Sequence, residues 1–587
     1  MLSKGGFFLF SLTVFACGVL LFAGSARAVM IQQWTASYNG PADDWDAAYD
    51  VATDANGNVY VTGYSNDGTS VPDVFVAKYD PHGVELWTQR WDGLTHESDA
   101  AVSIAVDRDG NAYLAGSTAS GGQADALLLK YNTDGDFQWQ VIYDGGHGDD
   151  AFIRVAVDGA GFVYVAGSAK SASAGLDYVV AKYNGDGVEQ WLSLNNGPAN
   201  GDDWATGLAL DSDGSVYING QQTTGAGMDV ALVKYSSTGA FQWKTFLNGA
   251  LAGSIDYGGS VVVNGADRIF YSGMLDNAGT GYDIATAFVD KNNTVSWLQT
   301  IDGSAHINDY LPEYLVIPLW VAPGVRDLAI GAIDSVYAIG IVNDTTTNKD
   351  IVTAKYSLGG ALQWWMTFNL AGTYDDLAVS LAVDQNETAF VAGFGTTDGA
   401  FNKYVTLMYD SGGGLLDSQT FAAPGGQENK AQNITVDPDG NPIVTGYGWQ
   451  GAAEEYNAYT VKYCVGCLIS SVCYPNGVTS VDNPCLICDV FTSQTGWSNN
   501  DGAACDDGLF CNGADACAAG TCSAHAGDPC NADETCDEAS DVCVPQSDDD
   551  ATPDDDTTSD DDLIADDDTI DDDAAGDDNG GSGGCGC

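Results

Sequence analysis

Basic residues and cysteines are scarce over most of this 587-residue chain. There are 19 Lys and Arg against 82 Asp and Glu, and no Lys or Arg lies between Cys464 and Cys587. A chain this acidic repels nucleic acid phosphates and anionic membranes, so we expect neither as a partner, whereas multivalent cations remain candidates. Cysteine is absent between Cys17 and Cys464, and then twelve occur up to Cys543. This dense cluster predicts a disulfide framework, which requires an oxidising compartment, although the pairing cannot be deduced.

Long apolar runs and catalytic motifs are also missing. After the N-terminal run from Phe7 to Gly24, no stretch is long and apolar enough to span a bilayer, so no transmembrane segment is expected. The chain has no nucleophile elbow, HExxH motif, phosphate loop or nucleotide fingerprint. We therefore predict no catalytic residue and no cofactor, with calcium as the one candidate ion.

Residues 1–28 have the pattern of a secretory signal peptide. Lys4 precedes the apolar run, and the small-residue site Ala26-Arg27-Ala28 predicts cleavage after Ala28. An uncleaved membrane anchor and lipid attachment at Cys17 are the weaker alternatives. We expect the protein to be secreted or held at the cell surface.

One unit is repeated eight times between residues 29 and 463. Its clearest copy, residues 99–145, has four short apolar or alternating runs separated by Asp, Gly and Asn, which is typical of a four-stranded antiparallel meander. The copies are 51 to 53 residues apart, except for one step of 67, when aligned on the residues that close the first strand: Asp54, Asp107, Asp158, Asp211, Asn264, Gly331, Asp384 and Asp437. Such meanders bury their faces by stacking around an axis, so we predict an all-β, eight-bladed β-propeller.

The two ends of the array complement each other. The sequence QQWTASYNG, Gln32 to Gly40, looks like the fourth strand of the unit, and the eighth unit has no fourth strand after Tyr463. We therefore predict that the N-terminal strand completes the last blade and closes the ring.

The repeated pattern resembles the bacterial family called SBBP. The residues that carry the resemblance are D-x-x-x-x-x-IAVD-x-x-G-N-x-Y-x-x-G, followed by D-x-x-x-x-KY-x-x-x-G-x-x-x-W, over nearly all of residues 31–463. The resemblance implies a propeller on a secreted or surface protein and implies no catalytic motif. The family label refers to seven blades, so seven blades with one unit in another role is the alternative.

Two sets of acids recur within the units. One acid lies eight residues before the closing residue, where the sixth unit has Pro323 and the eighth has Asn429: Asp46, Asp99, Asp150, Asp203, Asp256 and Asp376. The other lies six residues before the tyrosine of the third strand: Asp73, Asp125, Asp177, Asp229, Asp283 and Asp350. Both sets should form rings of loop carboxylates on one face. The favoured interpretation is that they accept backbone N–H groups, and the sharper one is that the first six bind a metal ion such as calcium at the channel mouth.

Three further patterns have structural interpretations. The DxDG turns at Asp107, Asp211 and Asp437 are better explained as hairpin turns with Gly at positive φ than as calcium loops. Lysine recurs on the third strand, where it should pair with a carboxylate between blades or protect an exposed edge: Lys78, Lys130, Lys182, Lys234, Lys355 and Lys462. Tryptophan recurs on the fourth strand, where packing between blades is expected: Trp87, Trp139, Trp191, Trp243, Trp297 and Trp364.

The long step is an insertion that enters blade six within residues 304–324. It should bring six residues to the face with the carboxylate rings, and all of them except Asp309 are predicted to bind the ligand: His306, Asp309, Tyr310, Glu313, Tyr314 and Trp320. Loops on a rigid scaffold often carry binding, and these aromatic residues suit stacking on a sugar or a peptide. A loop that only covers the channel is the alternative.

The C-terminal part divides at composition changes. Residues 464–546 resemble cysteine-rich modules of secreted bacterial proteins, and we expect six disulfides among these cysteines: Cys464, Cys467, Cys473, Cys485, Cys488, Cys505, Cys511, Cys517, Cys522, Cys530, Cys536 and Cys543. Zinc at Cys464/Cys467 and Cys485/Cys488 is the alternative. Residues 547–587 form an Asp-rich tail that ends with Cys585 and Cys587, and we expect this tail to be disordered.

These observations predict an exported, monomeric, non-enzymatic binding or adhesion protein. The expected partner is an extracellular glycan, peptide or protein. The alternative is an extracellular enzyme that acts on polysaccharide or peptide at the face bearing the 304–324 insertion.

Overall fold

The computed structural model describes residues 29–546, apart from 43, 67, 69–70, 173–174, 226, 252, 307, 310–326, 333–334, 346–347 and 452–455. The predicted signal peptide and acidic tail lie outside these residues. The described chain falls into two compact units. The first unit runs to Ala503 and includes Cys517–Thr521, and the second comprises Ala504–Ala516 and the residues from Cys522 onward.

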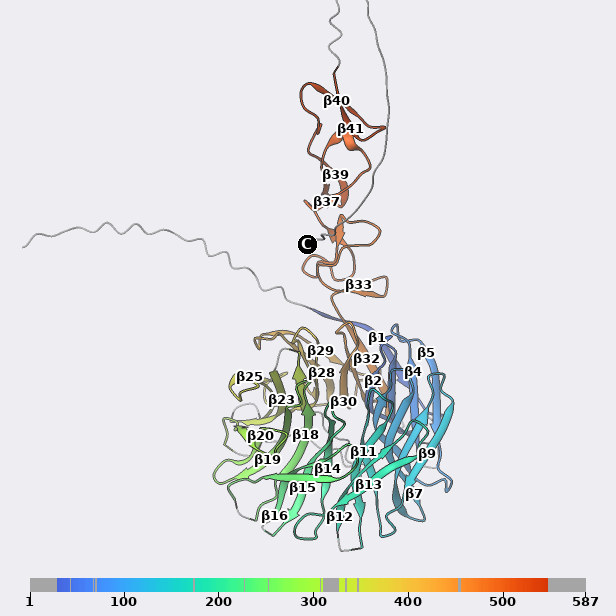
Figure 1. Ribbon diagram of the computed structural model, residues 1–587, viewed down its shortest axis with the longest axis vertical. Coiled ribbons are helices and arrows are strands. Elements are labelled where there is room, and N and C mark those ends of the chain that lie inside the picture. Colours follow the sequence, from blue (N-terminus) through green and yellow to red (C-terminus); the bar gives the residue numbers. More distant parts are fainter. Residues whose placement is uncertain are drawn as a thin grey trace, which may run out of the picture. The chain divides into compact units, whose positions relative to one another are not determined.

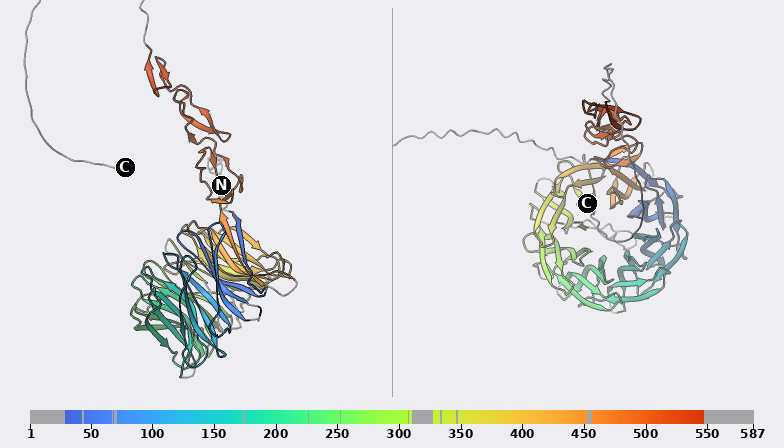
Figure 2. Two further views of the ribbon diagram at one scale, coloured as in Figure 1. Left: turned by 90° about the vertical axis from the view of Figure 1, so that its right-hand side faces the viewer. Right: turned by 45° about the horizontal axis from the view of Figure 1, so that its top comes forward.

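The first unit contains eight four-stranded antiparallel sheets among its described residues, arranged in a ring (Figures 1 and 2). Blades 1 to 4 are β2 (Asp46–Thr53), β3 (Val59–Asn66), β4 (Pro72–Tyr79), β5 (Glu85–Trp91); β6 (Asp99–Val106), β7 (Ala112–Ser120), β8 (Gln123–Tyr131), β9 (Phe137–Tyr143); β10 (Ala151–Val157), β11 (Val163–Lys170), β12 (Leu176–Tyr183), β13 (Glu189–Asn195); and β14 (Trp204–Leu210), β15 (Val216–Thr224), β16 (Gly227–Tyr235), β17 (Phe241–Leu247). Blades 5 to 8 are β18 (Tyr257–Val263), β19 (Ile269–Asn277), β20 (Gly281–Val289), β21 (Val295–Ile301); β22 (Leu328–Gly331), β23 (Ser335–Asp344), β24 (Asn348–Ser357), β25 (Leu362–Phe368); β26 (Asp376–Val383), β27 (Ala389–Gly395), β28 (Lys403–Tyr409), β29 (Leu415–Phe421); and β30 (Asn429–Val436), β31 (Pro442–Trp449), β32 (Tyr456–Val465) with β1 (Met30–Tyr38). The predicted eight-bladed propeller is confirmed.

The N-terminal strand closes the ring as predicted. β1 pairs antiparallel with β32, with Trp34 opposite Lys462 and Ala36 opposite Thr460. The eighth sheet therefore has the order β1-β32-β31-β30 and contains both ends of the repeat array. This pairing leaves no open seam between the first and last blades.

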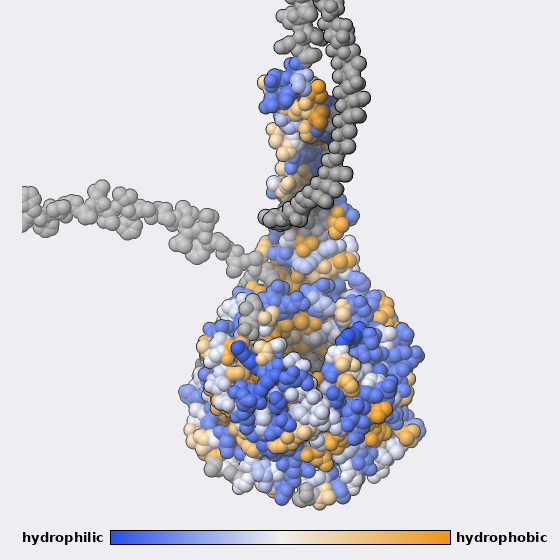
Figure 3. All heavy atoms as spheres, viewed as in Figure 1, coloured by the Kyte–Doolittle hydropathy of each residue, from blue (hydrophilic) through white to orange (hydrophobic). Residues whose placement is uncertain are grey.

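The hydrophobic core lies between neighbouring blades. One cluster joins Leu128 of blade 2 to Val165 and Val179 of blade 3, and another joins Val61 of blade 1 to Ile443 of blade 8. Because each blade is covered on both faces, its second and third strands are almost continuously buried, as in β3 and β4. The outermost strands are partly exposed, and on the side of the propeller shown in Figure 3 hydrophobic residues are scattered among hydrophilic ones.

Tryptophan links each of seven blades to the next, which confirms the predicted packing role. The indole N–H of Trp87 donates to the carbonyl of Thr133 in the following blade at 3.0 Å, and the ring covers Gly135 in that turn. The equivalent pairs are Trp139–Gly185, Trp191–Ser237, Trp243–Lys291, Trp297–Leu358, Trp364–Ser411 and Trp34–Pro81. Trp34 comes from the N-terminal strand, so the same contact seals the junction of blade 8 with blade 1.

The recurrent lysines support the same junctions. Lys78 Nζ lies over the ring of Tyr60 in its own blade and donates to Thr133 in the next blade. Lys462 pairs with Asp437 at 2.7 Å, and Lys355 pairs with Glu387 of the following blade at 2.9 Å. The predicted pairing with a carboxylate of another blade therefore holds at Lys355. Lys462 pairs with an acid of its own blade and reaches the next blade through the carbonyl of Pro81.

The seventh blade departs from this scheme. Met408 stands where six of the other blades have lysine, and Asp417 stands opposite it where the other seven have tryptophan. Asp417 Oδ2 instead accepts the backbone N–H of Met30 at 2.7 Å. The contact thus joins blade 7 to the first residue of the closing strand.

The cysteine-rich region begins at the end of β32 and is divided between the two units. The first unit contains β33 (Cys467–Ile469), β34 (Val472–Tyr474), β35 (Leu486–Ile487) and β36 (Ser498–Asn499). The remaining segments are β37 (Ala504–Cys505), the 3-10 helix η1 (Phe510–Asn512), β38 (Asp515–Ala518), β39 (Thr521–His525), β40 (Glu534–Asp537) and β41 (Val542–Pro545). No described helix is long and apolar enough to cross a membrane.

All twelve cysteines from Cys464 to Cys543 form disulfides. The pairs are Cys464–Cys473, Cys467–Cys488, Cys485–Cys517, Cys505–Cys522, Cys511–Cys536 and Cys530–Cys543. This pairing confirms the predicted framework. It also overturns the zinc alternative, because zinc binds cysteine as a free thiolate and each sulfur here is already bonded to another sulfur.

We predict that Gly83→Ala destabilises the propeller more than Gly122→Ala. Both glycines have φ near +84°, so both substitutions carry the cost of a left-handed backbone, about 1–2 kcal/mol. A Cβ on Gly83 would lie 2.6 Å from the Trp34 ring, whereas a Cβ on Gly122 meets nothing within 4 Å. The added overpacking should cost about 1–3 kcal/mol more, measured by chemical denaturation of both variants. Equal losses of stability would contradict the proposed contact.

The disulfide pairing predicts a specific peptide map. Digestion of the unreduced, alkylated protein should yield cross-linked peptides for the six pairs and no alkylated thiol between Cys464 and Cys543. Mass spectrometry would contradict the pairing if it found Cys464 joined to Cys467.

Candidate functional site

The two predicted carboxylate rings lie on one face of the propeller. In blade 1, Asp46 pairs with Ser65, and Ser65 pairs with Asp73, so all three residues lie at the same end of the sheet. We call this side the loop face, and the opposite side, which carries the turn from Asp54 to Asn58, the turn face. The predicted placement of both rings on one face is confirmed by the strand register.

The first ring is buried and hydrogen-bonded to its own loops. The six predicted metal ligands, Asp46, Asp99, Asp150, Asp203, Asp256 and Asp376, are each no more than 1% exposed. Each accepts a backbone N–H from the preceding loop, donated by Gly40, Gly93, Gly145, Gly197, Gly249 and Leu370 respectively. This geometry agrees with the favoured structural interpretation, and a metal ion bound by these six residues together stays a prediction.

In blade 6 the residue that takes part in this ring is Asp309. The sequence alignment had assigned this position to Pro323. Asp309 is fully buried and accepts N–H groups from Gly303 and Asn343, just as Asp256 accepts those of Gly249 and Asp276. The inserted residues therefore come after Asp309 in the sequence. The alignment counted eight residues back from Gly331, and this count ended inside the insertion instead of at Asp309. In the eighth blade, Asn429 Oδ1 accepts the N–H of Ala423 in the same way.

His306 is the one predicted ligand-binding residue that the structure describes, since Tyr310, Glu313, Tyr314 and Trp320 lie outside the described residues. Its Nδ1 lies 2.6 Å from Asp302, and 67% of its side chain is exposed. His96 and Asp92 form the same pair at 2.6 Å in the loop that precedes blade 2. The His306 pair is therefore a repeated loop feature rather than one confined to blade six.

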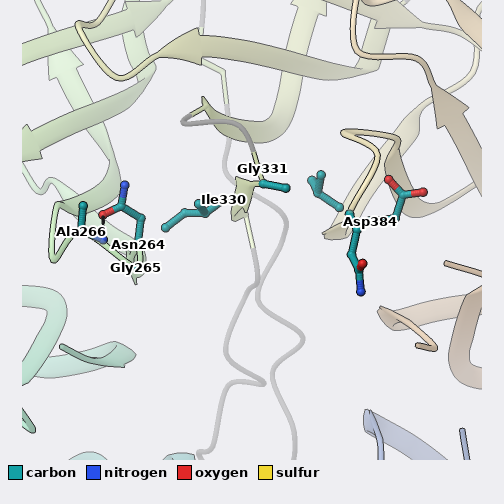
Figure 4. Close-up of a pocket in the computed structure, with 9 residues that line it drawn as sticks. Asn264, Gly265, Ala266, Ile330, Gly331 and Asp384 are labelled. Carbon is teal, nitrogen blue, oxygen red and sulfur yellow. Dashed lines mark hydrogen bonds between the residues drawn. The ribbon is translucent and has the colours of Figure 1, made fainter. Parts of the chain in front are cut away.

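The turn face carries two adjoining cavities of about 480 and 540 Å³, which share Asn264 and Gly265. Figure 4 shows Asn264, Ile330 and Asp384, which line the smaller cavity. Asn264 and Asp384 come from turns of blades 5 and 7, and Ile330 comes from strand β22 of blade 6. The wall consists of apolar residues at the ends of the inner strands: Val157, Leu210, Val263, Ile330 and Val383. We call these two cavities together the turn-face recess.

Blades 3 to 7 border the recess, and the turns of three of them carry small side chains. The turns of blades 3, 5 and 6 contain Gly159-Ala160, Gly265-Ala266 and Ala332, whereas the corresponding turns of blades 2 and 8 contain Arg108-Asp109 and Pro438-Asp439. The turn carboxylates themselves are occupied, because Asp107 accepts the N–H groups of Asp109 and Asn111 and the hydroxyl of Tyr113. Gly110, Gly214 and Gly440 all have positive φ, so the predicted hairpin turns are confirmed.

Sequence reasoning missed a third acid on the loop face. Asp92 follows β5, and one ligand atom each from Asp73, Asp92 and Asp99 lie within 4.8 Å of one another. Members of the two predicted rings thus meet between blades 1 and 2. A fixed spacing of 19 residues, seen in Asp73/Asp92 and Asp283/Asp302, was the signal that could have revealed this group.

Two buried carboxylates deeper in the inner strands were also missed. Asp50 is fully buried, and its Oδ2 accepts the N–H of Ile104 in the next blade at 2.9 Å. Asp327 is also fully buried, and its Oδ1 accepts the N–H of Ser260 in the previous blade at 2.8 Å. Both side chains act as links between neighbouring inner strands.

Burial raises the pKa of the ring carboxylates on the loop face. The pKa rises to about 6 for Asp46, Asp99, Asp203, Asp309 and Asp376. Desolvation disfavours the charged form, and neighbouring acids such as Asp350 and Asp375 beside Asp376 add to the shift. Negative charge on this ring therefore has a free-energy cost at neutral pH.

The fold and its repeated junctions define an eight-bladed β-propeller. Residues 43–68 and 93–122 match the family model described as SBBP, a beta-propeller repeat. The resemblance to this family that the sequence pattern indicated is thus matched over two segments, in blades 1 and 2.

Other similarities are more distant. Over 169 residues the chain is 29% identical to the regulatory protein FlaEY of Caulobacter vibrioides. The matched segment makes up 25% of this chain and 17% of that protein. Among solved structures, Sqt1 from Chaetomium thermophilum is 13% identical with a TM-score of 0.46, covering 73% of this chain and 99% of that one. The polysaccharide lyase Uly1 is 13% identical with a TM-score of 0.36, covering 64% and 91%. A glucose dehydrogenase is 10% identical with a TM-score of 0.32, covering 63% and 97%.

We predict that Asp376→Asn flattens the pH dependence of stability. Because the folded-state pKa is about 6 and the ordinary value is 3.8, the wild-type carboxyl contributes stability at low pH that is lost as the pH rises through 6. The asparagine can keep the hydrogen bond from Leu370, as Asn429 does with Ala423. The variant should therefore be more stable than wild type at pH 7, by up to about 3 kcal/mol.

Denaturation in EDTA at several pH values between about 4 and 7 would measure this effect. Asp375→Asn, which changes an exposed neighbour of Asp376, is the matched control and should retain most of the wild-type slope. Identical slopes in all three proteins would show that Asp376 is not the titrating group.

Proposed function

We propose that this protein is an exported, non-enzymatic binding protein that holds an extracellular glycan, peptide or protein segment in the turn-face recess. The disulfide framework supports export, because six disulfides persist only in an oxidising compartment. The closed ring supports binding, because it holds loops from five successive blades in fixed positions around one recess.

The recess is the observation that carries this proposal. Its two cavities fall within the range of about 300–1,000 Å³ that is typical of small-molecule sites. An apolar wall below a rim of Asn264, Asp384 and Gln385 offers both burial and hydrogen bonding. A short sugar or a few side chains of a peptide would fit these dimensions.

The proposed site differs in place from the one predicted at the 304–324 insertion. That prediction concerned the loop face, whereas the recess is lined by turns on the opposite side. The two faces can be separated experimentally, since a substitution in the recess does not alter His306.

The proposal predicts that Ala266→Trp abolishes ligand binding. Ala266 is exposed at the recess, so an indole would fill the cavity without disturbing the buried core. Asn56→Trp is the matched control, because Asn56 is exposed, occupies the same turn position in blade 1 and does not line either cavity. Binding of the full chain to arrays of extracellular glycans and peptides would be measured, followed by titration of each bound probe.

Loss of binding by at least about tenfold in Ala266→Trp, with normal binding in Asn56→Trp, would support the recess as the site. Binding that survives Ala266→Trp but is lost on substitution of His306 or Glu313 would place the site on the loop face and overturn the proposal. Release of cleaved product from a bound probe would show an enzyme instead.

A further inference from the structure

Six aromatic side chains gather on the loop face where blade 8 meets blade 1. Trp449 is paired with Tyr456 across the end of the β31–β32 hairpin, next to Asn457, which holds the position of the second carboxylate ring in blade 8. The hairpin end therefore belongs to the loop face. We call the six residues the loop-face aromatic cluster: Trp45, Tyr49, Tyr64, Tyr447, Trp449 and Tyr456.

Tyr456 lies at the centre of the outer part of the cluster. Its ring centroid lies 5.0 Å from that of Trp45, 5.4 Å from that of Trp449 and 5.5 Å from that of Tyr447. All three contacts are edge-to-face, with interplanar angles of 88°, 77° and 79°, which is a favoured geometry for aromatic pairs. The indole of Trp45 is thus held in place by Tyr456, while the residue remains 43% exposed.

The inner part of the cluster is buried. Tyr447 packs against a core cluster that contains Tyr49 and Tyr64, whose ring centroids are 5.6 Å apart. The hydroxyls of Tyr49 and Tyr64 are hydrogen-bonded to each other. The exposed indole of Trp45 therefore stands at the surface end of a packed aromatic base, so little conformational freedom is left to lose when a ligand binds.

The repeat shows that Trp45 replaces a residue with a structural task. The residue before the ring acid is an acid in four blades, and in blade 3 this acid, Asp149, accepts the N–H of Ala124 in the preceding blade at 3.0 Å. The equivalent pairs are Asp202–Leu176, Asp375–Lys349 and Glu428–Asn402. In blade 1 the two positions hold Trp45 and Tyr456. A ring contact thus stands where the repeat elsewhere makes a hydrogen bond between blades.

The other positions of the cluster also depart from the repeat. No other blade has an aromatic residue at the positions of Trp45, Tyr49 or Trp449. Other described tryptophans of the ring, such as Trp87, are used at the junctions between blades and are partly buried there. A group of aromatic residues confined to one boundary and ending at an exposed indole indicates a task that the other boundaries do not share.

The surroundings of the cluster favour an uncharged, hydroxyl-rich ligand. Asp44 accepts the backbone N–H of Trp45 at 2.8 Å, and the charges of Asp44 and Asp46 act on Tyr64. Lys430, opposite Tyr447 in the sheet, is paired with Glu428 at 3.4 Å. Unpaired negative charge beside the indole repels anionic ligands, whereas carboxylates readily accept hydroxyl groups. Rings packed against one another offer a stacking face, while a quaternary ammonium is held by rings that surround it.

We propose that the loop-face aromatic cluster binds a neutral saccharide, with the apolar face of one sugar ring stacked on the indole of Trp45. Asp44, the preceding residue, supplies a carboxylate that accepts the sugar hydroxyls. Tyr456 and Trp449 are positioning residues, because they hold the indole through ring contacts. This site lies on the opposite side of the propeller from the turn-face recess and does not depend on it.

Calorimetric titration of the full chain would test this site. The probes are neutral hexasaccharides of glucose, mannose and galactose, with hexagalacturonate as the anionic comparison. At least one neutral probe should bind, and hexagalacturonate should bind at least about tenfold more weakly. Trp45→Ala should weaken binding of that neutral probe by about tenfold or more, because it removes the stacking face.

Two further variants separate stacking from a loss of structure. Trp45→Phe keeps a ring at this position and should retain more of the binding than Trp45→Ala. Trp365→Ala is the matched control, because Trp365 is 41% exposed on β25 and makes no ring contact within the described chain. It should bind the probe as wild type does.

An absence of binding by all three neutral probes at millimolar concentration would overturn the proposal and leave the cluster a role in ring closure. Equal weakening by Trp45→Ala and Trp365→Ala would also overturn it, as would hexagalacturonate binding as tightly as the neutral probe. If every bound neutral probe is lost in Ala266→Trp and retained in Trp45→Ala, the sugar site is the turn-face recess. In that case this proposal fails while the proposed function stands.

Discussion

The contact between a tryptophan and the following blade's turn is the interaction on which the ring depends. Each of these indoles donates its N–H to a backbone carbonyl, and six of the seven also cover a glycine of that turn. Glycine serves two needs here, since the turn requires positive φ and a side chain would occupy the volume of the indole. In blade 5 the turn residue is Asn293, which reaches φ of +69° and also donates its side-chain amide to Lys244.

Closure of the ring uses the same contact with residues from opposite ends of the chain. Trp34 of the first strand and Lys462 of the last strand both donate to the carbonyl of Pro81. The junction of blade 8 with blade 1 therefore has the chemistry of the other junctions, although its parts are far apart in sequence. The exception is blade 7, where Asp417 binds the backbone of Met30 and so adapts that blade to the strand that closes the ring.

The two faces of the propeller have different chemical characters. The loop face concentrates buried carboxylates at the boundaries between blades, where the ring geometry brings acids from consecutive blades together. On the turn face the carboxylates are already used by their own hairpins, so the recess offers an apolar wall and a polar rim.

Much of the architecture was predictable because the repeat is local and regular. The spacing of residues such as Asp54 and Asp107 determined the number of blades, and the isolated strand around Trp34 determined how the ring closes. Pairing among twelve cysteines could not be deduced, because sequence spacing alone allows many connectivities. Asp309 was missed because the alignment assumed a constant distance to Gly331, and the insertion interrupts that distance.

The meander, its eightfold repetition and the residues at each turn follow from the sequence alone. The meeting of Asp73 with Asp92 and Asp99, and the recess beside Gly265 and Ala266, follow from the packing of neighbouring blades. The physical reason is that hydrogen bonding and strand alternation act along one blade, whereas such sites form where neighbouring blades pack, and their geometry exists only once the ring has closed.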